Sequence, residues 1–391
     1  MIRLPLVLAA LPLAACATPP MPTDLASGPA AKAYLARIAA LDDAGPRLNA
    51  VMVVNPDAPA QARTAAEAGL PLGGRTVLVK DNIETREWPT TAGSLALANN
   101  ATGRDAPLVA RLRAAGGVVL GKTNLSEWAN IRSSRSTSGW SAVGGQTRNP
   151  HAIDRNPCGS SSGSGAAVAA GFAWAAIGTE TDGSITCPAS VNGIVGLKPT
   201  VGLVSRTHVI PISHSQDTPG PMARTVADAA LLLNAISGSD PADPATAEAD
   251  GRKVDYVAAL ASASLQGVRI GVLRKQVGDN PQVERLFNEA LADLARAGAI
   301  LVPIDFDEPE GLGEAEFSTL LFELREDLAA YLASSPADIP VRTLADVNAF
   351  NQAHAAEEMR WFGQDIFEQA ERTTDREAYQ AARAKALRLA G

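Results

Sequence analysis

The first part of the chain alternates short apolar runs with segments whose apolar residues recur at helical spacing. Residues 30–40 and 60–68 have the helical pattern, and Pro107 opens a further helix through Ala115, in a first-turn position where proline is tolerated. Between them, LNAVMVV (Leu48–Val54) and RTVLV (Arg75–Val79) have the apolar character of buried strands. This alternation predicts an α/β fold with a mixed, partly parallel sheet packed between helices.

The rest of the chain is predicted to be mostly helical, with two further strands. The predicted helices cover residues 225–236, 282–297, 314–332, 344–370 and 376–389, and the predicted strands cover residues 269–273 and 300–304. Ser133–Pro157 is polar, rich in glycine and without periodicity, and loops of this length in compact domains are usually functional or disordered. No repeat or linker divides the chain after its N-terminal segment, which favours a single domain.

The first residues are typical of a targeting segment. Arg3 precedes an apolar run, Leu4–Ala15, that is too short to span a bilayer. The run ends in Leu-Ala-Ala-Cys, which resembles the lipobox of bacterial lipoproteins and implies cleavage before Cys16 and lipidation of that residue. An ordinary secretory signal cleaved nearby is the alternative. We therefore expect an exported protein, periplasmic or membrane-anchored, with a signal peptide over 1–16, a tether over 17–29 and one domain over 30–391.

Composition narrows the classes of function. With 46% hydrophobic and 19% charged residues the chain is globular, and a net charge of −8 without a basic stripe argues against nucleic-acid binding. Besides Cys16, the chain contains Cys158 and Cys187, which flank two serine-rich loops. We expect both to be buried free thiols, with a disulfide as the alternative in an oxidising compartment. No CxxC or His/Cys cluster suggests a metal, and we expect no cofactor.

Two loops rich in glycine and serine lie between Asn156 and Arg206, on either side of a run of small apolar residues. Such loops can present a serine nucleophile, which needs a base to remove its proton. Ser161 is at the centre of a G-x-S-x-G sequence, but the preceding HAIDRNP cannot form the buried strand that a nucleophile elbow requires. No lysine follows a serine by three positions, so the S-x-x-K signature is absent. Lys80 and Lys198 could act as bases if burial keeps them neutral, although a strand-end lysine is ordinarily solvated or ion-paired.

These segments resemble the amidase signature of the amidase signature family of serine hydrolases. The resemblance covers Gly159–Arg206 continuously and extends to the strand and lysine of Val77–Ile83 and to GKTNLSEWA (Gly121–Ala129). It persists through QDTPGPMARTVADAA (Gln216–Ala230). The resemblance implies one domain with a mixed sheet between layers of helices.

The same resemblance implies a Ser–cis-Ser–Lys triad. Ser184 would attack an amide carbonyl, Ser160 would relay its proton from a position after a cis peptide bond, and neutral Lys80 would be the terminal base. The oxyanion would be bound by backbone N–H groups of the intervening loop, from Thr181, Asp182, Gly183 and Ser184. A serine acyl-enzyme would form, ammonia or an amine would leave, and water would complete the hydrolysis.

Three departures from the usual family pattern bear on the substrate and on the extent of the domain. Asp182 replaces a common glycine, so its carboxylate must point away from the oxyanion or be paired, and Thr186 replaces a common arginine. The missing arginine argues against a glutaminase with a tRNA-dependent partner. GTETDGSI-x-CPA and PISHSQDTPGPMAR most resemble the peptide amidase branch, which implies release of ammonia from the C-terminal amides of peptides. The alternatives are an acylamidase for small aliphatic or aryl amides and a non-catalytic binding lipoprotein. Family members generally continue beyond the helix that ends here at Leu389, so we expect the C-terminal part of the domain to be missing.

Overall fold

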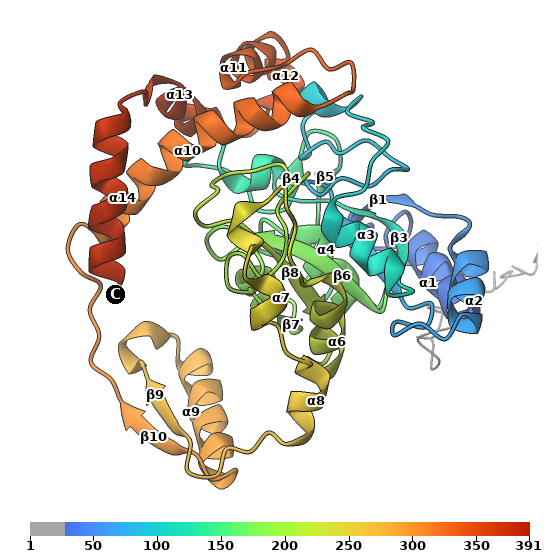
Figure 1. Ribbon diagram of the computed structural model, residues 1–391, viewed down its shortest axis with the longest axis vertical. Helices are drawn as coiled ribbons and strands as arrows, with labels where there is room; N and C mark the ends of the chain where they lie inside the picture. Colours follow the sequence, from blue (N-terminus) through green and yellow to red (C-terminus); the bar gives the residue numbers. More distant parts are fainter. Residues whose placement is uncertain (1–27) are drawn as a thin grey trace, which may run out of the picture.

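A six-stranded mixed sheet forms the core of the protein, which a computed structural model describes for residues 28–391 (Figure 1). The strand order is β1-β3-β2-β6-β8-β7; β3, β2 and β6 run parallel, and the other three strands are antiparallel to their neighbours. The strands are β1 (Val51–Val54), β2 (Thr76–Lys80), β3 (Val118–Thr123), β6 (Ala175–Glu180), β7 (Val195–Gly196) and β8 (Thr218–Ala223). Every residue of β2, β3, β6 and β8 is buried, as expected for strands covered on both faces.

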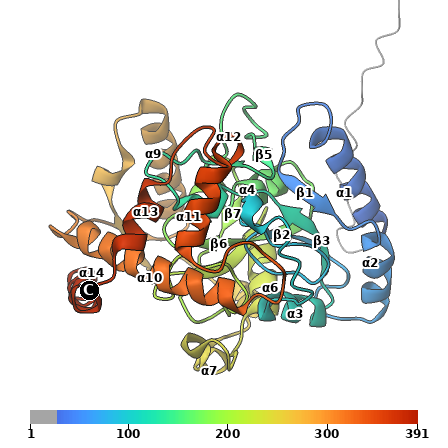
Figure 2. The ribbon, with the colours of Figure 1, turned by 90° about the horizontal axis from the view of Figure 1, so that it is seen from above.

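Helices cover both faces of this sheet (Figure 2). Val77 and Val79 of β2 pack on one face with apolar side chains of α3 (Pro107–Ala114) and α6 (Val226–Ile236). Leu78, which points to the other face, packs in a second apolar cluster with α1, α2 and α4. These helices are α1 (Gly28–Leu41), α2 (Ala58–Glu67) and α4 (Ser162–Ala169). The predicted α/β class, mixed sheet and single domain are confirmed.

Five further helices follow the sheet and pack beside its loops, where Figure 1 draws them in orange and red. They are α10 (Leu312–Ser334), α11 (Leu344–Ala353), α12 (Ala355–Glu358), α13 (Asp365–Arg372) and α14 (Arg376–Ala390). A third apolar cluster joins α10, α11 and α13 to residues from earlier in the chain that include Trp128 and Ile210. The predicted single helix over 344–370 is wrong: it is divided into three, with the first break at His354 and an irregular segment before α13.

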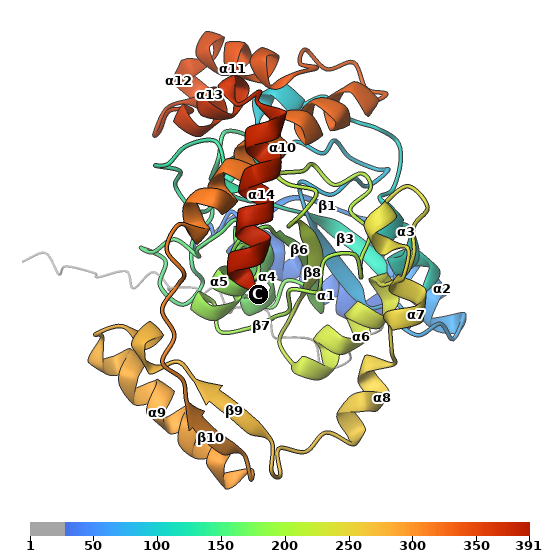
Figure 3. The same cartoon turned by 60° about the vertical axis from the view of Figure 1, so that its left-hand side comes forward.

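A smaller unit stands apart from the sheet (Figures 1 and 3). It comprises β9 (Arg269–Val272), α9 (Pro281–Arg296) and β10 (Ile300–Pro303), with the two strands parallel. No residue of α9 is buried, and large apolar side chains are exposed on this unit, among them Val283, Leu286 and Ile300.

The remaining elements are short. They are α5 (Thr186–Val191), α7 (Ala249–Arg252), α8 (Tyr256–Ala261), the strands β4 (Trp140–Ser141) and β5 (Gly145–Gln146), and the 3₁₀ turns η1 (Leu95–Leu97), η2 (Glu127–Asn130), η3 (Pro244–Thr246) and η4 (Arg274–Val277). Strand β8 was not predicted, because Pro219 and Pro221 make its sequence read as a loop. Among residues 28–391, no helix combines the length and apolar character needed to cross a membrane. The predicted signal peptide lies outside the described residues.

Candidate active site

Neighbouring strands bring the predicted triad together. Lys80 is the last residue of β2, Ser160 lies in the loop that leads into α4, and Ser184 lies between β6 and α5. Because β2 and β6 are adjacent and parallel, their carboxyl ends meet at one edge of the sheet. The two serine loops start or end at this edge, although 80 residues separate Lys80 from Ser160 in the chain.

The Lys80 side chain lies against Ser160 in a site without solvent exposure. Its Nζ is 2.8 Å from Ser160 Oγ, and both residues are completely buried. Burial lowers the pKa of Lys80 to about 7, against the opposing effect of the negative charges of Asp217 and Glu180. A substantial neutral fraction is therefore available near pH 7. The peptide bond between Gly159 and Ser160 is cis, as the resemblance implies.

Ser184 is held next to this pair by its backbone. Its carbonyl accepts a hydrogen bond from the Ser161 N–H at 3.0 Å, and the residue is 8% exposed, whereas Lys80 and Ser160 are completely buried. Within the described part of the chain, no hydrogen bond joins its hydroxyl to Ser160, so the predicted relay is not closed in this structure. Catalytic hydrogen bonds often tighten only when substrate binds.

The loop before Ser184 can present backbone donors. Among the described residues, the N–H groups of Asp182, Gly183 and Ser184 have no hydrogen-bond partner, which leaves them available to an oxyanion. Gly183 has φ +72°, a left-handed conformation that glycine adopts without strain. The Asp182 side chain is exposed and, in the region described, forms no ion pair.

Ser161, the serine at the centre of the G-x-S-x-G sequence, is hydrogen-bonded to strand β6. Ser161 is completely buried; its Oγ donates to the Thr179 carbonyl at 3.1 Å and accepts from the Thr179 N–H at 3.2 Å. Ser162 Oγ donates to the Cys158 carbonyl at 2.7 Å. Lys198, the other candidate base, is exposed. The rejection of Ser161 as the nucleophile agrees with this geometry.

Four polar residues around the triad were not singled out from the sequence. Thr179 and Asn82 lie beside Lys80, and the Glu180 carboxylate accepts from the N–H groups of the two residues after Ser184, at 2.7 and 2.9 Å. Asp217 accepts from two backbone N–H groups and from the Thr181 hydroxyl, and its burial raises its pKa to about 6. All four lie within the segments that resemble the amidase signature family, so the resemblance could have indicated them.

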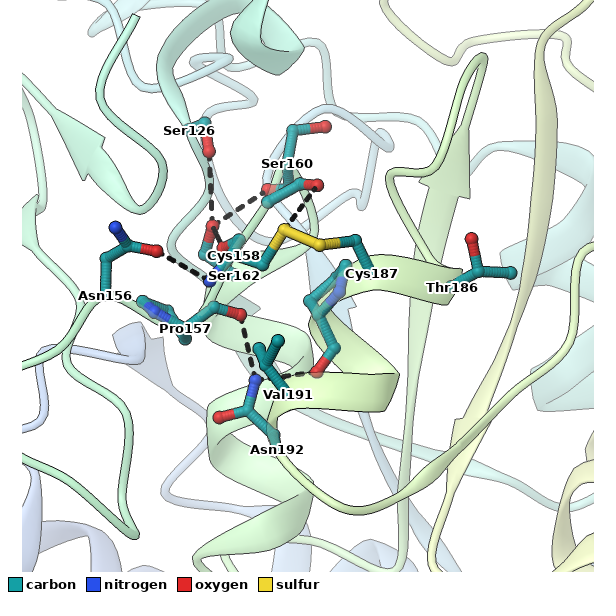
Figure 4. The surroundings of a disulfide bond; sticks show 12 residues. Ser126, Asn156, Pro157, Cys158, Ser160, Ser162, Thr186, Cys187, Val191 and Asn192 are labelled. Atoms are coloured by element: carbon teal, nitrogen blue, oxygen red, sulfur yellow. Dashed lines mark hydrogen bonds between the residues drawn. A yellow bond between two sulfur atoms is a disulfide. The ribbon is translucent and has the colours of Figure 1, made fainter. Parts of the chain in front are cut away.

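Cys158 and Cys187 form a disulfide (Figure 4), with their Cα atoms 6.0 Å apart. The expectation of buried free thiols is therefore wrong: the two cysteines are bonded to each other, and both are only partly buried. The bridge joins the loop of Ser160 to the start of α5, three residues after Ser184. The two serine loops are covalently connected.

Two cavities near the carboxyl end of β6 share part of their lining. Arg206, Val209 and Asp217 line both a small cavity beside Thr179 and a wider one of about 470 Å³. The wider cavity extends to Tyr331 on α10. Among the described residues that line the two cavities, none belongs to the predicted triad.

One group of side chains in the described region has metal-ligand spacing: His214, Glu323 and Asp327 place ligand atoms within 4.8 Å of one another. These atoms already have partners. His214 Nδ1 is 2.9 Å from an Asp327 oxygen, and the Tyr379 hydroxyl donates to Glu323 at 2.7 Å. The cluster is accounted for as a hydrogen-bonded network.

Comparison with known proteins identifies the family. A model of the family described as Amidase matches residues 30–390. The chain belongs to the amidase family. Among solved structures it is similar to native peptide amidase from Stenotrophomonas maltophilia, with 52% identity, a TM-score of 0.89, and coverage of 94% of this chain and 77% of that chain. A structure of peptide amidase with the competitive inhibitor chymostatin matches equally well, with a TM-score of 0.89.

Curated sequences give the same family. A probable amidase of Arabidopsis thaliana is 43% identical over 87% of this chain and 68% of that protein. One component chain of the glutamyl-tRNA(Gln) amidotransferase of Cupriavidus metallidurans is 44% identical over 72% of this chain and 58% of that protein. The chain thus spans about three fifths to two thirds of the length of these two relatives. It is an amidase-family hydrolase of amide bonds.

Proposed function

We propose that this amidase removes the C-terminal amide of peptides, with Ser184 as nucleophile, Ser160 as proton relay and Lys80 as base. The observation that carries the proposal is the buried lysine, whose Nζ is 2.8 Å from Ser160 Oγ. Burial makes a neutral amine available, and a neutral amine can accept the proton that a serine must lose before it attacks.

The reaction follows from this arrangement. As Ser184 Oγ bonds to the amide carbon, its proton passes to Ser160 Oγ and the Ser160 proton passes to Lys80 Nζ. The oxyanion that forms accepts hydrogen bonds from backbone N–H groups of the loop 181–184. Collapse breaks the C–N bond, and the proton returns through Ser160 to the departing nitrogen, which leaves as ammonia. Water then attacks the acyl-enzyme by the same proton route and releases the peptide acid.

Several features support a peptide substrate. The likeness to peptide amidase at 52% identity extends over 94% of the chain. A cavity of about 470 Å³ begins at Asp217, which accepts a hydrogen bond from Thr181 at the start of the loop before Ser184, and it can hold a residue of a peptide. Thr186 is exposed, and its N–H and hydroxyl face Glu180. It therefore offers no cation for a charged substrate group.

Ammonia release tests the proposal. Purified protein is incubated with a peptide amide and with a small aryl amide, and Ser184→Ala is compared with Ser161→Ala as the matched control. We expect ammonia from the peptide amide, loss of activity in Ser184→Ala, retention in Ser161→Ala, and competitive inhibition by chymostatin. Activity on the aryl amide alone would exclude the peptide specificity. No ammonia from either substrate, together with no labelling of Ser184 by a sulfonyl fluoride, would exclude the proposed reaction and favour the non-catalytic binding lipoprotein.

We propose in addition that the protein is exported and anchored by lipid at Cys16, which lies outside the described residues. The disulfide supports export, because such bonds persist in oxidising compartments and are rare in the cytosol. Labelled palmitate should be incorporated by a producing bacterium and lost in Cys16→Ala. A labelled Cys16→Ala protein would contradict the anchor.

A further inference from the structure

Three oxygen atoms surround the Lys80 amine. Ser160 Oγ and Thr179 Oγ1 are each 2.8 Å from Nζ, and the Thr179 carbonyl oxygen is 3.3 Å away. Lys80 is completely buried, so these are the hydrogen-bond partners that its amine has within the described chain. Two of the three belong to one residue.

The number of hydrogens on the amine fixes the direction of each bond. A neutral amine has two hydrogens and one lone pair. The Thr179 carbonyl can only accept, so one hydrogen points to it. If Lys80 is the base for Ser160, its lone pair faces the Ser160 hydroxyl, and the second hydrogen is donated to Thr179 Oγ1.

The same partners satisfy the protonated lysine. After proton transfer, the new N–H points back to Ser160 Oγ, and both bonds to Thr179 stay as they were. The proton therefore moves along the line from Ser160 to Lys80 without rotation of the amine.

Asn82 holds the Thr179 hydroxyl in place. Its Nδ2 donates to Thr179 Oγ1 at 3.0 Å, and its backbone carbonyl accepts from the Ile210 N–H at 2.8 Å. Both acceptor positions of Thr179 Oγ1 are then occupied, one by Asn82 and one by Lys80. Thr179 is β-branched, which further limits rotation of its side chain.

We propose that Thr179, held by Asn82, is a positioning residue that directs the lone pair of Lys80 at Ser160. The proposal deepens the proposed function, on which it rests, because it takes Lys80 as the terminal base. Thr179 and Asn82 also line the small cavity beside the triad, so a role in substrate binding has to be separated from positioning.

A reaction rate that does not involve an amide substrate can separate positioning of Lys80 from a role in substrate binding. The rate of inactivation by a sulfonyl fluoride, measured against pH, reports activation of Ser184 without any amide substrate. Thr179→Val keeps the shape, the branching and the backbone carbonyl and removes only the hydroxyl. Thr179→Ser restores the hydroxyl, and Thr179→Ala replaces the valine variant if that protein does not fold.

The sulfonyl fluoride should inactivate Thr179→Val about 10-fold more slowly than the wild type at high pH. The acid limb of the profile, in which the inactivation rate rises with pH as Lys80 loses its proton, should move to lower pH by about one unit. The limb moves down because the ammonium form loses a stronger hydrogen bond than the neutral form, which lowers the pKa of Lys80. Thr179→Ser should keep the limb of the wild type and most of its rate. A Thr179→Val protein with an unchanged limb would overturn the proposal.

Asn82 provides the second test. Asn82→Leu should lower the inactivation rate, and the double variant with Thr179→Val should be no slower than Thr179→Val alone, because Asn82 acts only through the hydroxyl. Losses that multiply in the double variant would show that Asn82 acts by another route. If the wild type itself is not labelled on Ser184, the proposed function fails rather than the positioning role.

Discussion

Removal of the disulfide is expected to lower both stability and activity. Cys158 and Cys187 are 29 residues apart in sequence, so the bridge closes a loop of about 30 residues in the unfolded chain. On the chain-entropy model, such a loop destabilises the unfolded state by about 3.5 kcal/mol. Replacement of both cysteines by alanine should reduce the free energy of unfolding by that amount.

The loss of activity has a geometric cause. The bridge fixes the segment before Ser160 to the segment after Ser184, and displacement of catalytic groups by about 1 Å can cost on the order of 100-fold in rate. We expect kcat to fall between about 10- and 100-fold in the double variant.

Urea unfolding, extrapolated to water, measures the stability term, and ammonia release measures kcat. The single variants Cys158→Ala and Cys187→Ala are the matched controls. Each should lose as much stability as the double variant, since either change breaks the bridge. Single losses that add in the double variant, or a double variant as stable and active as the wild type, would show that the bridge contributes neither to stability nor to the geometry of the site. Alkylation of both cysteines in unfolded, unreduced protein would show that the bridge does not form.

Three further predictions concern single residues. Because Lys80 must be neutral to accept a proton and burial lowers its pKa to about 7, kcat/KM should rise with pH through about 7 and then level off; Lys80→Ala should lose about 10²–10⁴-fold and lack this limb, and normal activity in that variant would exclude the lysine as base. Lys122 is 3.1 Å from the buried carboxylate of Asp81, so Lys122→Met should cost about 3–5 kcal/mol in urea unfolding, and a cost below about 1 kcal/mol would show that the pair is dispensable. Ser161→Ala should cost about 1–3 kcal/mol, because it leaves the buried Thr179 N–H without its partner and removes one of the donors to the Thr179 carbonyl, yet it should change kcat/KM little; a collapse of kcat/KM would reinstate Ser161 as the nucleophile.

The sequence was most informative where apolar periodicity is strong. The predicted strand at residues 75–79 and the amphipathic helix at 282–297 are present within one or two residues at each end. It was least informative at β8, Thr218–Ala223, where two prolines suggest a loop but pairing with both β6 and β7 produces a central strand. Tertiary pairing there overrides local preference.

The active site was likewise predictable from the sequence only in part. Its motifs could be read in order along the chain, and through a family resemblance they suggested Lys80, Ser160 and Ser184. Spacing alone could not place Lys80 beside a serine 80 residues away, because that contact depends on the pairing of β2 with β6. The disulfide was missed because its formation depends on the distance between two loops, which the sequence does not contain.

The most direct test of the triad is to identify the serine that becomes covalently modified. The protein is inactivated with a sulfonyl fluoride, digested, and the modified peptide is mapped by mass spectrometry, with chymostatin as a protecting ligand. We expect modification of Ser184, prevented by chymostatin and abolished by Ser184→Ala. Modification of Ser160 or Ser161 in place of Ser184 would contradict it.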